Sequence, residues 1–177
     1  MPTQSEKIEL TPHELREITS YAAECARRTL SIFEQSVPAD PRPRDAIDAA
    51  QAFAEGGRRT AALRQSAWAA FRAAREAASP AAADAARAAS HAAAAAYLHP
   101  LADAHQVKHL LGAAAHAARA EELASGEDQR VTAGTLEWAR HHAPTAVTAV
   151  LGRMPAAPPG GSRVGEFIRD LDAALRA

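Results

Sequence analysis

A chain of 177 residues is long enough to fold as one domain that buries about 70% of the surface its unfolded form exposes, without help from a disulfide or a metal. Its formal net charge of -1 at pH 7 excludes a general electrostatic attraction to nucleic acid or to acidic membranes. The single cysteine excludes an intrachain disulfide, and the polar N-terminus and the lack of a long apolar stretch predict a soluble, cytoplasmic protein.

Alanine is abundant and β-branched residues are sparse, so nearly every periodic segment predicts helix and no window alternates like a strand. We predict an all-α fold, a single-domain, alanine-rich bundle of about seven helices. The first helix opens with "TPHE", where Thr11 caps, Pro12 takes the first helical position and Glu14 completes a capping box. Apolar or small side chains then recur at spacings of three and four, which predicts a core-facing stripe that includes an inert Cys25 and ends before Pro38.

The next three helices are separated by proline and glycine. The turn "PADPRPR" leads into a second helix from about residue 44 to 55, which Gly56 and Gly57 stop. A third helix is predicted from about residue 59 to 78. Ser79 then caps a fourth, which begins at Pro80 and reaches about residue 98, so that the third and fourth form an antiparallel hairpin.

The last part of the chain contains the clearest linker. Pro100 starts or kinks a helix that runs to about residue 124, and a weaker helical region spans residues 128–151 with an interruption at Pro144. The stretch "MPAAPPGGS" predicts a linker. The predicted organisation is a bundle over residues 1–153, a linker over 154–162, and an amphipathic helix over 163–177 that docks on the bundle or on a partner.

The stretch "HQVKHLLGAAAH" places His105, His109 and His116 on one stripe of a helix. Histidines four residues apart can chelate one metal ion. The metalloprotease pattern fails here, however, because Gln106 stands where the catalytic glutamate is needed. His116 lies about 10 Å along the helix from His105, so a site made of these three residues would need help from another helix. Histidines satisfied by hydrogen bonds in a helical core or groove are the more frequent case.

No arrangement of side chains in the sequence indicates nucleophilic catalysis, and we predict that the protein is not an enzyme. The large residues Trp68, Phe71, Tyr97 and Trp138 are embedded in alanine-rich helices rather than in a basic groove. We interpret them as anchors that fill the core. A genome rich in G and C would favour alanine and arginine codons with no function attached.

Three stretches carry a resemblance to a known family: "LSIFEQSVPADPRPRDAIDAAQAFAEG", "WAAFRAAREA" and "ARAASHAAAAAYLHPLADAHQVKHLLGAAAHAARA". Together they resemble the bacterial Imm-5-like immunity proteins over about residues 15–151. The most specific parts are the "RPR" turn at residues 42–44 and the run from Tyr97 to Gly112. Alanine periodicity alone would match many unrelated helical proteins.

The resemblance implies a non-enzymatic protein that neutralises a toxin deployed against neighbouring cells by binding it. The histidines of "YLHP" and "QVKH" belong to the family pattern, whereas the position of His105 often holds a small polar residue and that of His116 can hold an aromatic one. The residues that this pattern singles out, for binding or for structure, are Arg42, Arg44, Tyr97, His99, Gln106 and His109.

Other functions stay open at this point. A metal-dependent or metal-binding protein would use the histidine cluster, a nucleic-acid accessory protein would use the arginines, and a self-associating protein would use exposed alanine faces. The slightly acidic net charge argues against nucleic acid. We predict no cofactor and a protein partner, the cognate toxin, and leave a homo-oligomer open.

Overall fold

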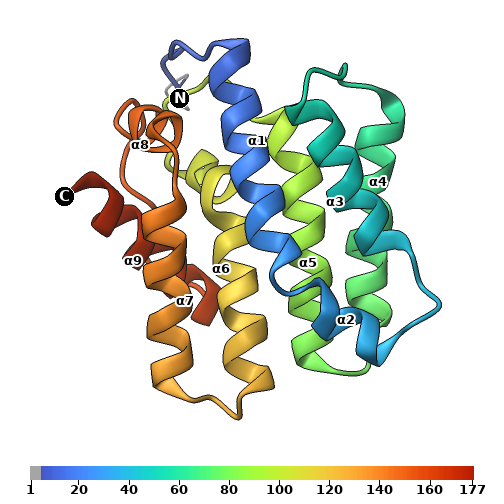
Figure 1. The fold of residues 1–177 in the computed structure, drawn as a ribbon. Helices are drawn as coiled ribbons and strands as arrows, with labels where there is room; N and C mark the ends of the chain where they lie inside the picture. Colours follow the sequence, from blue (N-terminus) through green and yellow to red (C-terminus); the bar gives the residue numbers. More distant parts are fainter. Residues whose placement is uncertain (1–4) are drawn as a thin grey trace.

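The computed structural model describes residues 5–177, and this part of the chain is built from helices (Figure 1). The α-helices are α1 (Pro12–Arg27), α2 (Leu30–Ser36), α3 (Arg42–Ala54), α4 (Ala61–Glu76), α5 (Pro80–Ala94), α6 (Val107–Ala124), α7 (Gln129–His142), α8 (Thr145–Leu151) and α9 (Arg163–Arg176). Two 3-10 helices, η1 (Ala95–Tyr97) and η2 (Ala104–Gln106), lie between α5 and α6. The predicted all-α class is confirmed. Within residues 5–177, none of the helices has the length and apolar character needed to cross a membrane.

The predicted count of about seven helices is slightly low, because the first expected helix is broken in two and the helical region after residue 128 forms two helices on either side of its expected interruption at Pro144. The first ends at Arg27, and Thr29 follows with φ -113° and ψ 1°, its hydroxyl donating to the carbonyl oxygen of Ala26 at 3.3 Å. The region after residue 128 is broken at Pro144, which has no N–H to donate and which forces Ala143 into an extended conformation. The described residues therefore form nine α-helices.

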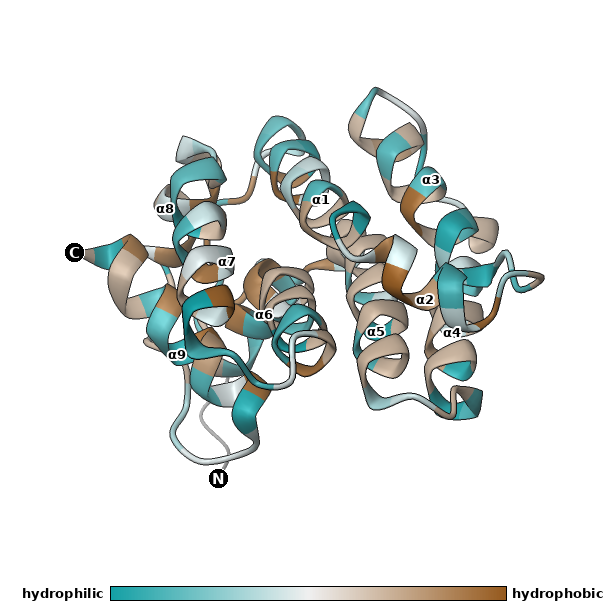
Figure 2. Cartoon of the chain, turned by 60° about the horizontal axis from the view of Figure 1, so that its bottom comes forward, coloured by the Kyte–Doolittle hydropathy of each residue, from teal (hydrophilic) through white to brown (hydrophobic). Residues whose placement is uncertain are grey.

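The helices α4, α5 and α6 form a row with α5 in the middle (Figure 2). One side of the row is covered by the N-terminal helices: α1 packs on α5 and α6, α2 on α5, and α3 on α4 and α5. The helices α7 and α9 pack on α6, at the end of the row away from α4 (Figure 1). Within residues 5–177, the central helix α5 therefore packs against five other α-helices, α1 to α4 and α6.

The predicted stripe of α1 faces the core as expected. Leu15, Ile18, Ala22 and Cys25 are buried, with at most 8% of each residue exposed. Burial raises the pKa of the Cys25 thiol to about 12, so this cysteine is protonated and unreactive at neutral pH. Tyr21 on the same helix donates its hydroxyl proton to the carbonyl oxygen of Ala139 at 2.7 Å and so ties α1 to the end of α7.

The helix expected to start or kink at Pro100 begins later, because residues 100–102 bond to the N-terminal segment instead. The carbonyl oxygen of Pro100 accepts from the N–H of Ile8 at 3.0 Å, and the N–H of Ala102 donates to the carbonyl oxygen of Glu6 at 2.7 Å. Asp103 then caps η2 by accepting from the N–H of His105 at 2.8 Å. The segment before α6 is thus a fixed loop rather than a kinked helix.

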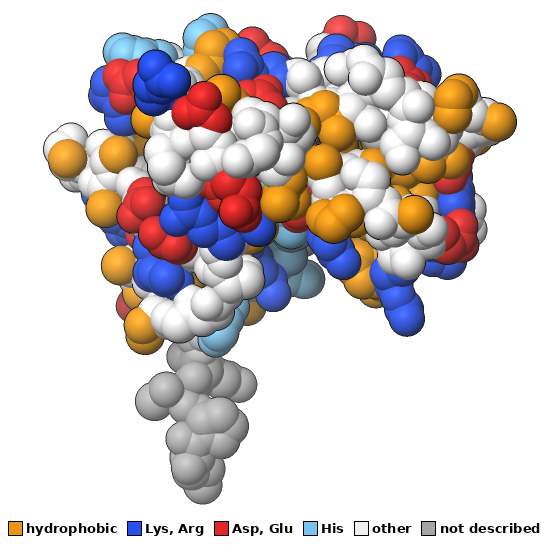
Figure 3. Space-filling model, turned by 90° about the horizontal axis from the view of Figure 1, so that it is seen from below, with side chains coloured by type: hydrophobic (Ala, Val, Ile, Leu, Met, Phe, Trp, Pro, Cys, Tyr) orange, Lys and Arg blue, Asp and Glu red, His pale blue; other side chains and the backbone are white. Residues whose placement is uncertain are grey.

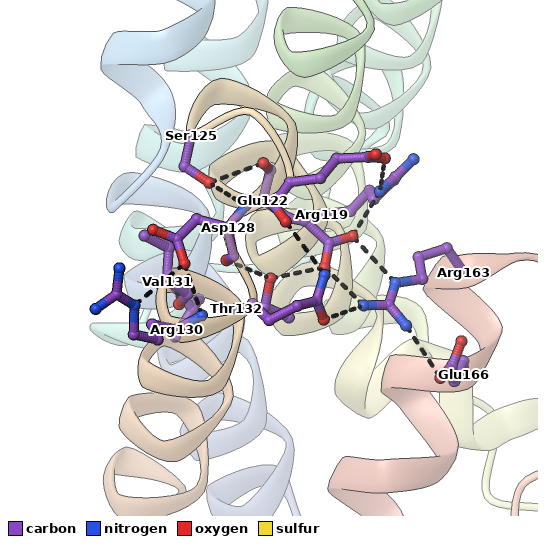
Figure 4. A network of polar contacts seen from close by, with 12 residues as sticks. Arg119, Glu122, Ser125, Asp128, Arg130, Val131, Thr132, Arg163 and Glu166 are labelled. Atoms are coloured by element: carbon purple, nitrogen blue, oxygen red, sulfur yellow. Dashed lines mark hydrogen bonds and ion pairs between the residues drawn. The ribbon is translucent and has the colours of Figure 1, made fainter.

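The C-terminal helix α9 packs along α6 and α7 and is held there by a buried carboxylate (Figure 4). Glu122 of α6 is 1% exposed and accepts from Arg163 at 2.7 Å and from the hydroxyl of Thr132 at 2.6 Å. The hydrogen bond from Arg163 is the main cause that lowers the pKa of Glu122 to about 2. Phe167 of α9, 1% exposed, packs beside this network, so α9 adds apolar contacts as well as an ion pair.

Candidate binding groove

The first wall of the candidate site is an exposed edge of α4. The buried stripe of this helix consists of Leu63, Ala67, Ala70, Ala73 and Ala74. Arg64, Trp68 and Phe71 each directly follow a residue of this stripe in the sequence. Their side chains are therefore rotated about 100° round the helix from the stripe and lie beside the core rather than in it. Trp68 is 59% exposed and Phe71 36% exposed, and their rings meet edge to face with centroids 6.1 Å apart. The interpretation of these two residues as core anchors is wrong.

The floor of the site is the outward face of α5, formed by Ser90, His91 and Ala94. Ser90 donates its hydroxyl proton to the carbonyl oxygen of Ala67 at 2.8 Å, which fixes α5 against α4. His91 lies against Gly112 of α6, where a Cβ atom would come within 2.5 Å of the histidine Nδ1. The glycine therefore makes room for the ring between the two helices.

A second histidine lies behind the floor and joins α5 to α6 a second time. The rings of His91 and His116 stack with their centroids 4.9 Å apart and their planes at 27°. Nδ1 of His116 lies 2.8 Å from Oδ1 of Asp84, and both side chains are mostly buried. This arrangement explains His116 as a structural residue that holds the floor in place.

The second wall comes from the segment between α5 and α6 and from the start of α6. It consists of Tyr97, His99, Lys108 and His109. Tyr97 donates its hydroxyl proton to the carbonyl oxygen of Thr60 at 2.6 Å, and the Arg64 guanidinium lies 4.6 Å from the centre of its ring. The buried side chain of Gln106 accepts from the N–H of His99 at 3.2 Å and so fixes the loop that carries the histidine.

Together these walls and this floor enclose a groove of about 820 Å³, which we call the α4–α5–α6 groove. None of its lining residues comes from α1, α2 or α3, so it opens on the side of the row that these helices leave free. Figure 3 shows histidine side chains in a recess between the two halves of the molecule, with lysine or arginine on either side. A shallower hollow of about 410 Å³ continues from Trp68 and Arg64 toward Arg59.

The groove is positively charged, but neither His91 nor His109 contributes to this charge. Burial, followed by the charges of neighbouring basic groups, lowers the pKa of His91 to about 3, and burial together with the nearby Lys108 lowers the pKa of His109. Both rings are therefore neutral at pH 7. The permanent positive charge comes from Arg64 and Lys108, and the lining residues include no carboxylate.

Aromatic rings, an arginine and a concave lining of mixed polar and apolar side chains suit the groove to binding a partner. A hollow of about 450 Å³ at the start of α1 is less suitable. Its Arg16 already donates to the carbonyl oxygens of Phe53 and Gly57.

The residues singled out from the sequence do not all gather in one place. Tyr97, His99 and His109 line the groove, and Gln106 supports it from below. Arg42 and Arg44 lie at the start of α3, where Arg42 pairs with Asp40 at 2.7 Å and Glu76 at 2.6 Å, and Arg44 pairs with Glu34 at 2.6 Å. The arginine turn is thus a junction of ion pairs outside the groove.

The three histidines of the metal alternative are distributed over three environments. His105 is exposed and lines a hollow with residues 157–161 of the linker, His109 lies in the groove, and His116 bonds to Asp84. Among residues 5–177 no group of three or more histidine, cysteine, aspartate or glutamate side chains is placed to hold a metal ion. The geometry of the described residues gives the metal alternative no support.

Sequence reasoning missed the features that characterise the groove: Trp68 and Phe71 as exposed residues, and Arg64 and Lys108 as its charges. One feature of the sequence could have indicated the exposure of Trp68 and Phe71. On α4 the spacings of Arg64, Trp68 and Phe71 define a stripe adjacent to the alanine stripe. Because this stripe contains an arginine, it is less apolar than a stripe that faces the core. No comparable signal marks Lys108, since its position depends on where α6 begins.

Comparison with known proteins supports the resemblance seen in the sequence. A family model described as "Imm-5 like putative immunity protein" matches residues 6–146, which contain every lining residue of the groove and stop short of α9. No curated protein and no solved structure matches the chain. Because the match spans most of the 177 residues, the chain belongs to the Imm-5-like family of immunity proteins.

Proposed function

We propose that the protein is a non-enzymatic immunity protein that neutralises a cognate bacterial toxin by binding it. Membership of the Imm-5-like family supports the role, and the α4–α5–α6 groove supplies a surface for it. The observation that carries the proposal is the exposure of Trp68, 59%, beside Arg64 and Phe71. Tryptophan and arginine are among the residues that most often dominate the binding energy of protein interfaces.

The proposed roles of the family-pattern residues differ. Tyr97, His99 and His109 face the partner from the second wall, while Gln106 positions His99 through its backbone. Arg42 and Arg44 act at a distance from the interface, since their ion pairs brace the start of α3 against α2 and α4. Substituting them should reduce stability more than affinity.

We also propose a place of action and a domain organisation. Cytoplasmic action is proposed because the chain has a single cysteine and therefore no intrachain disulfide, which is usual for proteins of reducing compartments. Residues 163–177 are proposed to belong to the same unit as residues 1–153, with 154–162 as the connector, because Glu122 and Phe167 bury their side chains at the contact with α9.

The test is co-expression with each toxin reading frame encoded next to the gene. Wild-type protein should restore growth, and purified protein should bind the toxin in isothermal titration calorimetry. Trp68→Ala should lower the affinity by about 30-fold or more, as truncation of a central interface residue does. Its thermal unfolding should match that of the wild type, because the side chain is largely exposed.

The matched control is Arg130→Ala on α7, which also truncates a long side chain, one that is 95% exposed and does not line the groove. This variant should rescue growth like the wild type. Lack of binding and rescue with every neighbouring toxin would refute the immunity role. Full rescue by Trp68→Ala would refute the placement of the interface in the groove.

A further inference from the structure

The charges of the chain are unevenly distributed along the sequence, and the segment that forms the groove carries an excess of positive charge. Between residues 58 and 118, which include α4, α5 and the first two-thirds of α6, there are seven lysine or arginine residues and three aspartate or glutamate residues. This segment therefore carries a formal charge of +4 within a chain whose total is -1. The near-neutral total therefore conceals a basic segment, and two of its basic residues, Arg64 and Lys108, line the groove.

The three acidic residues of this segment are already engaged. Glu76 accepts from Arg42 at 2.6 Å, Asp84 lies 2.8 Å from His116, and Asp103 accepts from the N–H of His105 at 2.8 Å. By contrast, neither Arg64 nor Lys108 forms a salt bridge within residues 5–177. Both are exposed, one on each wall of the groove, so both are available to a carboxylate from outside.

Between these two charges the lining is partly apolar. Ala67 and Ala94 contribute methyl groups and Trp68 and Phe71 contribute rings, beside the polar side chains of Ser90 and His91. An apolar side chain placed there would bury the exposed part of both rings, and apolar burial contributes about 25 cal/mol per Å². A complementary ligand therefore combines an apolar anchor with negative charge on both sides of it.

We propose that the α4–α5–α6 groove binds an acidic polypeptide segment of the partner, with a large apolar side chain against Trp68 and Phe71 and carboxylates at Arg64 and Lys108. The inference rests on the proposed function in that the segment belongs to the toxin. It adds the chemistry of the partner surface, which the family name does not give.

A nucleic acid strand suits the same groove less well. Consecutive bases stack on parallel aromatic faces, whereas Trp68 and Phe71 stand at 87° to each other. The third ring, Tyr97, already has the Arg64 guanidinium 4.6 Å from its centre. The methyl groups of Ala67 and Ala94 also offer nothing to a phosphate backbone, so a polypeptide with alternating acidic and apolar side chains is the better complement.

The experiment uses the full chain and two fluorescein-labelled synthetic peptides, one in which glutamate alternates with leucine and phenylalanine, and one with lysine in place of every glutamate. Fluorescence anisotropy should show binding of the acidic peptide only. Affinity should fall by about tenfold or more in Arg64→Glu/Lys108→Glu and by about 30-fold in Trp68→Ala. It should also fall severalfold at high salt, because exposed charges are screened.

The control double variant is Arg130→Glu/Arg140→Glu, which makes the same change in net charge on α7 and should bind like the wild type. Equal binding of the lysine peptide, lack of binding of the acidic peptide, or tighter binding of fluorescein-labelled oligothymidylate would each overturn the inference. In the rescue assay, unchanged rescue by Arg64→Glu/Lys108→Glu would also overturn it while leaving the immunity role intact. Peptide binding without rescue would instead sustain the groove chemistry and refute the immunity role.

Discussion

Gly112 sets how closely α5 and α6 approach beneath the groove, so its replacement by alanine should destabilise the protein. An added Cβ would lie 2.5 Å from Nδ1, 2.8 Å from Cε1 and 3.0 Å from Cγ of His91. Non-bonded carbon atoms pack at about 3.5–4.0 Å. The ring must therefore move by roughly 1 Å, or the two helices must separate by a similar amount.

Three effects determine the size of the loss. Overpacking of a well-packed site costs about 1–3 kcal/mol. Disturbing the stack of His91 on His116 adds about 0.5–1.5 kcal/mol, while the higher helix propensity of alanine returns about 1 kcal/mol. The free energy of unfolding should fall by about 1–3 kcal/mol in Gly112→Ala, which lowers the Tm by about 3–10 °C for a domain of this size.

Thermal and urea denaturation followed by circular dichroism would measure the effect, and the chain offers a matched control. Gly134 lies within α7, and nothing lies within 4 Å of a Cβ added there, so Gly134→Ala should raise the unfolding free energy by about 0.5–1 kcal/mol. In a His91→Ala background the penalty at Gly112 should disappear. The reasoning is refuted if Gly112→Ala is as stable as the wild type, or if its penalty persists without the His91 ring.

Three further predictions concern buried groups. Glu122→Gln should lower the unfolding free energy at pH 7 by about 3 kcal/mol, because the pKa of the Glu122 carboxyl is about 2 in the folded protein and 4.5 ordinarily. Acid denaturation of both proteins should show the stability difference between wild type and variant shrinking as the pH falls from 4.5 to 2. The ring of His91, faced by His116, His109, Lys108 and Arg87, resists protonation down to a pKa of about 3, whereas the unfolded residue protonates near 6.5. Lowering the pH from 7 to 5 should therefore cost about 2 kcal/mol in urea titrations of the wild type, and His91→Ala should lack this loss. Deleting residues 162–177 should remove the apolar contacts of Phe167 and Leu171 and also Arg163, the partner of Glu122. We expect the unfolding free energy to fall by about 3–6 kcal/mol. An unchanged stability in calorimetry would contradict the packing of α9 on the bundle.

Local chemistry allowed many helix boundaries to be predicted from the sequence. The capping box of Thr11 and Glu14 forms as expected, and Ser79 caps α5 with Pro80 at the first helical position. Both signals lie within four residues, and a helix end depends mainly on such short-range hydrogen bonds. The core stripe of α1 was predictable for a similar reason, since its spacing matches the helical repeat.

Features that depend on distant contacts could not be predicted in this way. The loop at Pro100 is extended because it bonds to residues 6 and 8, and no local pattern reveals that pairing. The exposure of Trp68 depends on α4 lying at the end of the row, where no other helix of residues 5–177 covers that edge. Tryptophan is usually well buried, so its side chain alone predicts the core, and only the position of the helix in the bundle overrides that expectation.

The high alanine content of α5 accounts for both the packing of the bundle and the presence of the groove. Its buried residues are almost all alanine, and short side chains allow several helices to approach one helix closely. On its outward face the same short side chains leave the space between α4 and α6 unfilled, where a leucine at position 94 would occupy it. Codon bias explains abundant alanine, but it does not explain a tryptophan on the rim of this space. An exposed indole contributes little to the folded core and favours aggregation, and a partner that covers it gives a physical reason for its position.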